Sequence, residues 1–359
     1  MSRPEHPPPL RADRWPRLHA ATVVLWRAPD TVQLELGTRR VLLRNVDQSQ
    51  LAPLLAPAPS AAARPVEATE RRRVPGALIR ALQHRGFLTR RPPAPGAMDS
   101  AAPAFLTPEL TALAGRFGDD AAALLARRRQ LAVAVHGTTR ISTTIAASLA
   151  AAGIGQVHLV GGSEASAADS CPGGLLPDDE GRRFAVAGAE ATRRASPTVS
   201  TAAIDYGRPA DLVVLTDPAP IDPTVREGLH LEGRAHLAAH VAGSRAVIGP
   251  LVVPGRTSCL RCAELVRREH DRDWPLLAIQ LASRPRHRTH SEVALCVAAA
   301  GAAAGQALGF LDGQRVETMS GTMEWQLPDW RLRRRSWPAH PACGCGAAGA
   351  RNEDGTMEW

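Results

Sequence analysis

Near the middle of the chain, two short apolar runs lie on either side of a helical pattern. The first run, residues 133–136, stops at Gly137, and the second covers residues 157–160. Between them, apolar side chains recur three or four positions apart, at Ile145, Leu149 and Ala152. This spacing predicts a helix between two parallel strands, and Gly153 predicts its end. The stretch therefore predicts the strand–turn–helix–strand unit of an α/β fold.

Later patterns extend this unit. Apolar runs predict strands at residues 211–217 and 246–252, and an Ala- and Gly-rich pattern predicts a buried helix over 292–311. Residues 229–239 predict another helix, and residues 318–326 with 330–335 predict a hairpin. Together these elements favour a Rossmann-like α/β domain with a mostly parallel sheet.

The first ninety residues show a different pattern. Three short strand signals come first, then helical spacing over 74–84, then a strand signal at 86–89; the first three cover residues 22–26, 31–36 and 41–43. This order predicts a small winged-helix-like α+β domain. The expected organisation is a disordered N-terminus (1–18), this domain (19–91), a linker with a helix (92–126), the α/β domain (127–346) and a flexible tail (347–359).

Composition narrows the possible environments and partners. The chain has 359 residues and a formal net charge of +8, and arginine supplies every basic side chain because lysine is absent. No run reaches the roughly 18 apolar residues of a membrane span, and the first residues lack a secretory apolar core, so we expect a cytoplasmic protein without a membrane partner. The charge permits an acidic partner, but an aromatic content of 4% does not favour nucleic acid.

Six cysteines in a cytoplasmic protein point to metal rather than to disulfides. Cys259 and Cys262 form a Cys-x-x-Cys pair, and Cys343 and Cys345 form a Cys-x-Cys pair. Four thiolates in two pairs suit a structural, tetrahedral zinc ion, with buried thiols lacking metal as the alternative. Cys171, in a polar loop, is expected to be a solvent-exposed bystander.

These features together resemble the ThiF-type branch of the ubiquitin-activating-enzyme-like superfamily. The matching stretches are the Gly137 turn, residues 127–129, 149–155, 211–217, 249–251 and 257–262. The resemblance covers residues 127–346 and implies zinc on the two cysteine pairs and a homodimer.

With its N-terminal domain, the chain resembles cyclodehydratase-associated ThiF-like proteins of azole-modified peptide biosynthesis. In that group a PqqD-like domain binds a leader peptide as an added strand for a YcaO-type partner enzyme. The resemblance implies a peptide-binding surface at Val41, Leu42 and Leu43, with the helix over 74–84 and its Arg80 beside it.

The resemblance also implies a nucleotide site, which this sequence keeps only in part. Its candidate residues are Gly137, Thr138, Thr139, Ser142, Arg128 and Asp217. Thr139 and Ser142 replace two glycines of the phosphate-binding turn, and Gly161 stands where the family has an acid that holds the ribose. Pro172 falls near the phosphate-binding arginine of the family and Phe184 near its lysine, and Arg182 or Arg183 could substitute for the lysine. Asp217 matches the aspartate that organises magnesium.

Three functions remain open at this point. The leading one is an adenylation-deficient scaffold that presents a peptide to a partner enzyme. The second is an active adenylyltransferase that uses ATP and magnesium, with Asp217 as its catalytic residue. The third is DNA binding through Arg80, Gln83 and His84 of the front domain. Finally, residues 321–325, Gly-Thr-Met-Glu-Trp, recur as residues 355–359, either by coincidence or as a strand-like or ligand-like tail.

Overall fold

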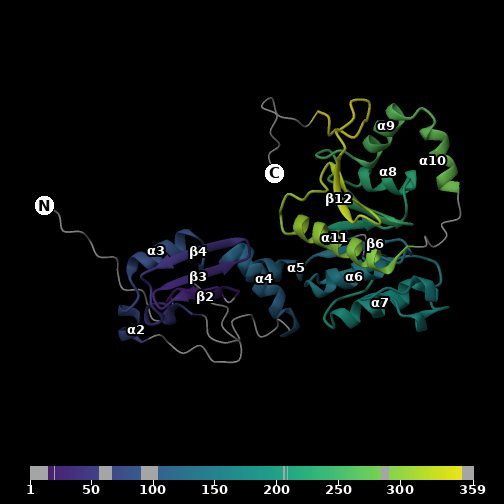
Figure 1. Cartoon of the computed structure of the whole chain (residues 1–359). Coiled ribbons are helices and arrows are strands. Elements are labelled where there is room, and N and C mark those ends of the chain that lie inside the picture. The colour runs from purple at the N-terminus through teal and green to yellow at the C-terminus, as the bar shows by residue number, and fades with distance from the viewer. Residues whose placement is uncertain are drawn as a thin grey trace. The chain divides into compact units, whose positions relative to one another are not determined.

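The computed structural model describes residues 15–19, 21–55, 67–89, 104–204, 207, 209–283 and 291–349. The chain divides into two compact units, residues 1–126 and 127–359 (Figure 1). The predicted disorder of residues 1–14 and the repeat at 355–359 lie outside the described residues. For Arg17 and Leu18 the prediction of disorder is wrong, because they form strand β1 (Arg17–Leu18), which pairs with β5 (Leu88–Thr89).

The first unit contains an antiparallel sheet in the order β2-β3-β4. Its strands are β2 (Val23–Ala28), β3 (Thr31–Leu36) and β4 (Arg39–Arg44). Side chains alternate between the two faces, so Val24, Leu34 and Val41 lie on the face that packs into the core. Among the described strands β2 and β4 each pair with β3 alone, which leaves both edges of the sheet open.

Short helices follow the sheet and cover its apolar face. They are α1 (Gln48–Leu51), η2 (Ala52–Leu54), α2 (Ala68–Arg72) and α3 (Gly76–His84). Asp47 and Gln50 form a capping box at the start of α1. Leu78 and Leu82 of α3 lie one turn apart and are buried with Val41 in the same core. This is the small α+β arrangement that the sequence predicts.

The helix expected before the central strand is broken in two. The elements here are η3 (Ala104–Leu106), α4 (Thr107–Phe117), η4 (Gly118–Asp120) and α5 (Ala121–Arg128). Gly118 ends α4 with a φ of +63°, a left-handed conformation that glycine adopts readily. Leu110 and Leu113 then pack against Leu125 in a small core of their own.

The second unit is built on a seven-stranded mixed sheet in the order β12-β11-β10-β9-β8-β6-β7 (Figure 1). Its strands are β6 (Ala132–His136), β7 (Gln156–Val160), β8 (Leu212–Leu215), β9 (His236–Ala242), β10 (Arg245–Val252), β11 (Gly321–Gln326) and β12 (Arg331–Ser336). The four strands from β7 to β9 are parallel, and β10, β11 and β12 add antiparallel pairs. The predicted α/β class is confirmed, and so are the hairpin and the parallel unit around Gly137.

Helices cover both faces of this sheet. They are α6 (Ser142–Ala151), α7 (Phe184–Ala195), α8 (Pro223–Leu231), α9 (Leu260–His270), α10 (Trp274–Ser283) and α11 (Val293–Leu311), with the single turns η5 (Ala167–Asp169) and η6 (Pro177–Asp179). Val133 and Val135 pack with α6 and α11 on one face, whereas Ala134 packs with α9 on the other. Alternate residues of a strand thus serve two separate cores.

Two expectations about helices need correction. The predicted helix over 229–239 is wrong, because α8 ends at Leu231, Gly233 turns the chain with a φ of +65°, and β9 begins at His236. The interior position of β9 between β8 and β10 overrides the helical preference of its alanines. The expectation that no segment is apolar enough for a membrane span also needs correction, because α11 meets that test by length and composition. Its Leu295, Ala299 and Ala303 are fully buried in the core of the second unit.

Candidate functional site

A cavity of about 290 Å³ opens where β6, β7 and β8 end. Strand β6 leads through α6 to β7 on one side, while β8 lies on its other side, so the cavity is at the point where the strand order reverses. Open α/β sheets bind ligands at such points. The lining comes from four segments: residues 136–140, 160–163, 168–169 and 215–225. The predicted Gly137, Thr138, Thr139 and Asp217 all lie here.

Gly137 is the residue that allows the turn after β6. Its φ is +115°, and a Cβ atom at this position would collide with the hydroxyl oxygen of Thr216. Asp217 Oδ1 would lie 2.9 Å from the same added atom. The first glycine of the turn is therefore required by the close approach of the loop after β8.

The hydroxyl of Ser142 closes the rest of the turn. Ser142 Oγ accepts the backbone N–H of Thr139 at 3.0 Å and lies 2.8 Å from Thr216 Oγ1. Thr216 Oγ1 in turn donates to the carbonyl of His136 at 2.8 Å. A backbone N–H of a phosphate-binding turn must point at the phosphate. Here the Thr139 N–H is already bonded within the protein, and Ser142 is buried rather than part of the cavity lining.

The first turn of α6 is covered by the loop over residues 171–175. Ser142 and Thr143 are fully buried. The backbone N–H of Leu175 donates to Thr143 Oγ1 at 3.3 Å, and Thr144 Oγ1 donates to the carbonyl of Pro172 at 3.3 Å. A helix N-terminus attracts anions only where an anion can reach its N–H groups. In this chain, protein atoms occupy that approach.

The position of the ribose-binding acid has no room for a side chain. Gly161 follows β7 directly, and a Cβ atom there would collide with the Cγ2 methyl of Thr138. An aspartate or glutamate at this position would therefore displace Thr138. The absence of an acid at Gly161 and the presence of the Thr138 side chain in the turn therefore depend on each other.

The charged groups of the cavity are mostly held by the protein itself. Arg140 donates to the carbonyls of Ser170 at 2.8 Å and Ser291 at 2.7 Å. Asp169 accepts the backbone N–H of Ser166, and Asp222 accepts that of Thr224. Burial, followed by the neighbouring His158, lowers the pKa of His136, which keeps this imidazole neutral at pH 7. The cavity thus offers three carboxylates and little positive charge for a polyphosphate.

Arg128 does not belong to this cavity, so its predicted contact with a nucleotide is wrong. It precedes β6, whereas the cavity lies where β6 ends. Its guanidinium is 2% exposed and forms a bidentate ion pair with Asp312, with N–O distances of 2.8 and 2.6 Å. It also donates to the carbonyl of Ala152 at the end of α6. Arg128 therefore holds the C-terminal end of α6, which is the end of that helix away from the Gly137 turn.

The proposed substitutes for the missing lysine lie outside the cavity. Arg182 forms ion pairs with Asp179 at 2.7 Å and Glu190 at 2.6 Å. Phe184, near the lysine position, is buried in a small apolar cluster. Arg183 precedes α7 as its N-cap residue. None of the three lines the cavity.

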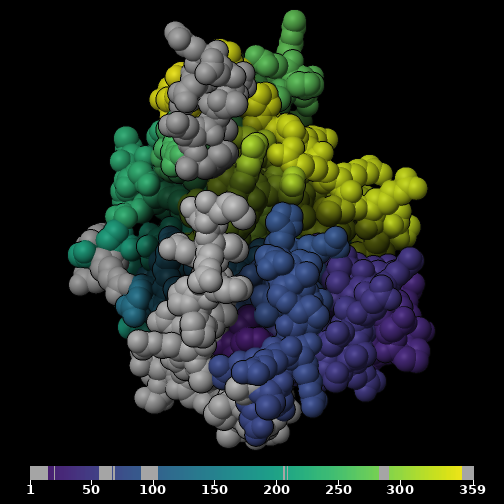
Figure 2. Space-filling view, turned by 90° about the vertical axis from the view of Figure 1, so that its left-hand side faces the viewer, coloured from purple at the N-terminus to yellow at the C-terminus, as the bar shows by residue number. Residues whose placement is uncertain are grey.

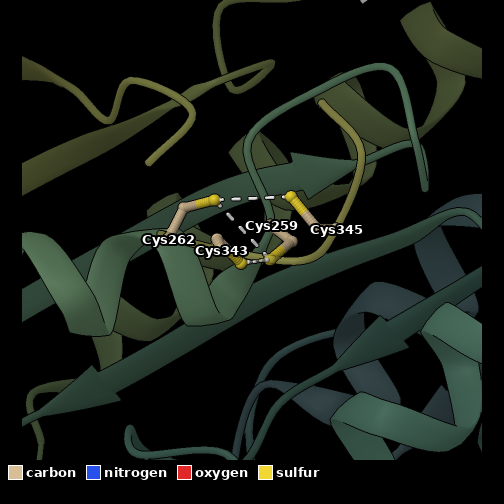
Figure 3. Close-up of side chains that lie close together, drawn as sticks. All are labelled: Cys259, Cys262, Cys343 and Cys345. Atoms are coloured by element: carbon tan, nitrogen blue, oxygen red, sulfur yellow. Dashed lines mark hydrogen bonds between the residues drawn. The ribbon is translucent and has the colours of Figure 1, made fainter. Parts of the chain in front are cut away.

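The four cysteines of the two pairs come together as the sequence predicts (Figure 3). Their sulfur atoms all lie within 4.8 Å of one another, and three of the separations are 3.8, 3.6 and 3.6 Å. A zinc ion with four Zn–S bonds of about 2.3 Å requires S–S separations of about 3.8 Å. The cluster therefore fits a tetrahedral, structural zinc ion, with Cys259, Cys262, Cys343 and Cys345 as its ligands.

The electrostatics of the cluster also favour a cation. The hydrogen bond from Cys259 lowers the pKa of Cys262 to about 4, helped by the backbone N–H of His340, which lies 3.4 Å from the sulfur. Burial raises the pKa of Cys343 to about 11. One thiolate is thus stable alone, but further thiolates repel it unless a positive ion lies among them.

The cysteine cluster joins distant parts of the second unit. Cys259 and Cys262 lie at the start of α9, and Cys343 and Cys345 lie near the end of the described chain. His340 Nε2 lies 2.8 Å from Glu269 of α9, which adds a second link between the same segments. Ala347 is buried in the adjoining core, so the predicted flexible tail is wrong at this residue.

Cys171 is buried, with 4% of its surface exposed, so the prediction of an exposed thiol is wrong. The loop that contains it packs against α6, and burial raises the pKa of its thiol. A raised pKa lowers the thiolate fraction, which makes Cys171 a poor nucleophile. Cys296 is fully buried in α11, as expected for a core residue.

The residues predicted to bind peptide lie on the outer strand of the small sheet. Val41 is buried in the core, Leu43 packs partly against it, and Leu42 on the opposite face is 39% exposed. Among these three residues, Leu42 therefore offers the most exposed side chain to a partner. Arg80 lies on the exposed side of α3, with Gln83 and His84.

The sequence matches no known protein-family profile and no curated protein. Solved structures do match. The microcin C7 biosynthetic enzyme MccB in complex with N-formylated MccA is 15% identical, with a TM-score of 0.68 over 92% of this chain and 99% of that chain. E. coli MccB with ATP is 16% identical, with a TM-score of 0.67 and the same coverage.

A heterocyclase in complex with substrate and cofactor also matches, with 16% identity and a TM-score of 0.60. The alignment covers 96% of this chain but 41% of the heterocyclase chain. The matches with MccB and with the heterocyclase span nearly the whole of this chain, so they include both of its units. They show that the chain shares its fold with these proteins.

Proposed function

We propose that this protein binds a peptide along the open edge of β4 and presents it to a separate modifying enzyme, without forming an acyl-adenylate. The observation that carries this proposal is the open edge of β4 beside a helix in the small front unit. The unpaired backbone groups of an edge strand accept an added strand, and neighbouring exposed side chains give selectivity.

The edge at β4 has the composition that strand addition needs. Leu42 offers an exposed apolar side chain, and Arg40 and Arg44 on either side are basic. Arg80 on the exposed side of α3 adds to this positive charge. A leader peptide with acidic and apolar residues would complement this edge. That the MccB structures include complexes with the peptide MccA agrees with peptide binding by this fold.

Closure of the Gly137 turn supports the lack of adenylation. Each charge-assisted contact with a phosphate or a ribose contributes roughly 1.5–3 kcal/mol. The acid after β7, the arginine and the lysine are all missing. Their combined loss of roughly 5–9 kcal/mol corresponds to several decades of affinity or rate.

The heterocyclase match supports a separate partner. This chain aligns with 41% of the heterocyclase chain, so the larger part of the heterocyclase lies outside the alignment. In our proposal, a YcaO-type cyclodehydratase supplies that part as another protein. The zinc ion has a structural role, because its four protein ligands leave no position for a substrate.

The peptide-binding edge can be tested with one substitution on each edge of the small sheet. Leu42→Asp on β4 should weaken binding of a fluorescein-labelled precursor peptide encoded beside the gene by about tenfold or more, because it places a charge in the apolar contact. Leu25→Asp on β2 is the matched control, since Leu25 is 44% exposed on the same face. Fluorescence anisotropy measures both affinities. Equal losses, or a loss with Leu25→Asp alone, would contradict binding at β4.

The lack of adenylation can be tested by ATP–pyrophosphate exchange with magnesium. We expect no exchange, with or without precursor peptides, and no ATP binding up to about 1 mM. Asp217→Ala should leave this baseline unchanged. If the unmodified protein does exchange pyrophosphate and Asp217→Ala abolishes it, the cavity is a working adenylation site and the second half of our proposal fails.

A further inference from the structure

Arg267 of α9 is a half-buried cation that lies against two indole rings. Its guanidinium lies 5.3 Å from the ring centre of Trp274 and 4.8 Å from that of Trp337. Among the described residues, no carboxylate or carbonyl accepts any of its five N–H donors within hydrogen-bond distance. Buried guanidinium groups are normally paired, because removing the charge from water costs free energy. The unmatched donors therefore point to a missing anion.

These donors border a cavity of about 570 Å³ between α9, the start of α10 and the end of β12. Its lining includes Arg267, Trp274, Arg335 and Trp337, with His270 and Asp271 at one side. Arg335 stacks on Trp337 at 5.4 Å, so the cavity combines two guanidinium groups with two indole rings. In the space-filling view, the C-terminal hairpin, coloured yellow, reaches the surface (Figure 2).

The surroundings of the cavity are positively charged. Arg331, Arg333 and Arg335 alternate along β12 and so lie on one face of the sheet, together with Glu324 of β11. Arg245 binds Glu324 at 2.6 Å, and Arg335 lies 3.9 Å from it. The one carboxylate inside the cavity lining, Asp271, accepts the backbone N–H of Asp273 at 3.0 Å.

The nearby imidazole adds no charge at pH 7. His240 lies on the same face of the sheet, and burial lowers its pKa to about 4, with Arg245 and Arg267 contributing. Burial also lowers the pKa of Arg267, and the nearby Glu264 and Glu324 only partly offset this effect. An added anion would restore the balance.

We propose that this cavity binds a carboxylate group carried next to an apolar or aromatic group, as in an acidic segment of a peptide. A carboxylate matches the planar fork of a guanidinium, and Arg245 already binds Glu324 on the same face. The two indole rings provide a surface for the adjoining apolar group. The volume is that of a pocket for a ligand of several residues rather than for a single ion. The cavity is formed by residues of the second unit, and carboxylate binding there does not require peptide binding at β4 of the first unit.

The test uses the full chain and the dipeptide N-acetyl-Glu-Trp, with binding measured by isothermal titration calorimetry. Arg267→Met keeps an apolar side chain between the two rings and removes the charge, so affinity should fall about tenfold or more. Arg268→Met is the matched control, because Arg268 is the next residue of α9, is exposed and does not line the cavity. Arg335→Met should weaken binding as well, which covers the case in which Arg267→Met fails to fold.

Each outcome has a clear meaning. The proposal is overturned if the unmodified chain does not bind N-acetyl-Glu-Trp at about 10 mM, or if Arg267→Met and Arg268→Met bind equally. It is also overturned if AMP binds in an Arg267-dependent manner and the dipeptide does not, since the ligand would then be a phosphate.

The source of the carboxylate can be identified in the same assay. Residues 350–359 contain Glu353, Asp354 and Glu358. If replacing these three with their amides increases affinity for the dipeptide, the chain's own segment competes for the cavity. If affinity is unchanged, these three side chains do not compete for the cavity, and the dipeptide titration of the Arg267→Met and Arg268→Met variants alone decides the proposal.

Discussion

Replacing Cys262 with serine is expected to release the bound zinc and lower the stability of the second unit by an amount on the order of 5 kcal/mol. The effect should be large because a zinc ion on these four cysteines would join α9 to a segment about eighty residues later in the chain, as the sulfur contact between Cys259 and Cys343 indicates. Without the ion, the remaining buried thiols contribute only weak hydrogen bonds. The measurement is zinc content by mass spectrometry together with thermal unfolding.

Cys296→Ser is the control for this experiment. Cys296 is also fully buried, but it lies in α11 and its sulfur contacts Ser291 Oγ at 3.2 Å, so a serine there has a hydrogen-bond partner. This variant should keep one zinc per chain and lose little stability. Finding no metal in the unmodified protein, or the same unfolding curve for both variants, would show that the cluster is only a group of buried thiols.

The ligands of the metal site could be predicted from sequence because cysteine is rare and paired spacing has few explanations. The β6–α6–β7 unit could be predicted for a related reason, since its periodicity changes at Gly137 and again at Gly153. Both signals are local, and neither depends on which distant residues pack against them.

The incorrect predictions concern residues whose structure is determined by contacts with distant parts of the chain. The alanines of β9 predict a helix, but their place between β8 and β10 makes them a strand. Arg128 stands before the central strand of the nucleotide fold, yet its partner Asp312 lies 184 residues away and no spacing in the sequence predicts that pair. Cys171 lies in a polar stretch that folds back onto α6, so a hydrophilic segment encloses a buried thiol.

The closure of the nucleotide turn could be predicted only in part. The sequence shows that Thr139 and Ser142 replace glycines, but it does not show that Ser142 also contacts Thr216, 74 residues later. Likewise, the conflict between Thr138 and any side chain at Gly161 requires the two loops to be side by side. The loss of the ribose acid thus appears in the sequence, whereas the reason that it cannot be restored alone appears only in the structure.

Breaking the ion pair between Arg128 and Asp312 should strongly destabilise the second unit. Asp312→Ala would leave a buried guanidinium without its carboxylate, which costs about 3–5 kcal/mol. The side chains of Arg128 and Asp312 are 2% and 1% exposed, so water cannot replace the lost partner. Asp329→Ala is the control, because Asp329 pairs with Arg333 on the surface at 3.5 Å, and its loss should cost about 0.5 kcal/mol or less. Urea unfolding of the two variants measures the difference.

The paired replacement Arg128→Met with Asp312→Leu separates the cost of an unpaired charge from the value of the pair. Because it removes both charges, it should recover most of the stability lost in Asp312→Ala. If the double variant is as unstable as Asp312→Ala, the pair stabilises the fold through its hydrogen bonds, including the one to Ala152 at the end of α6.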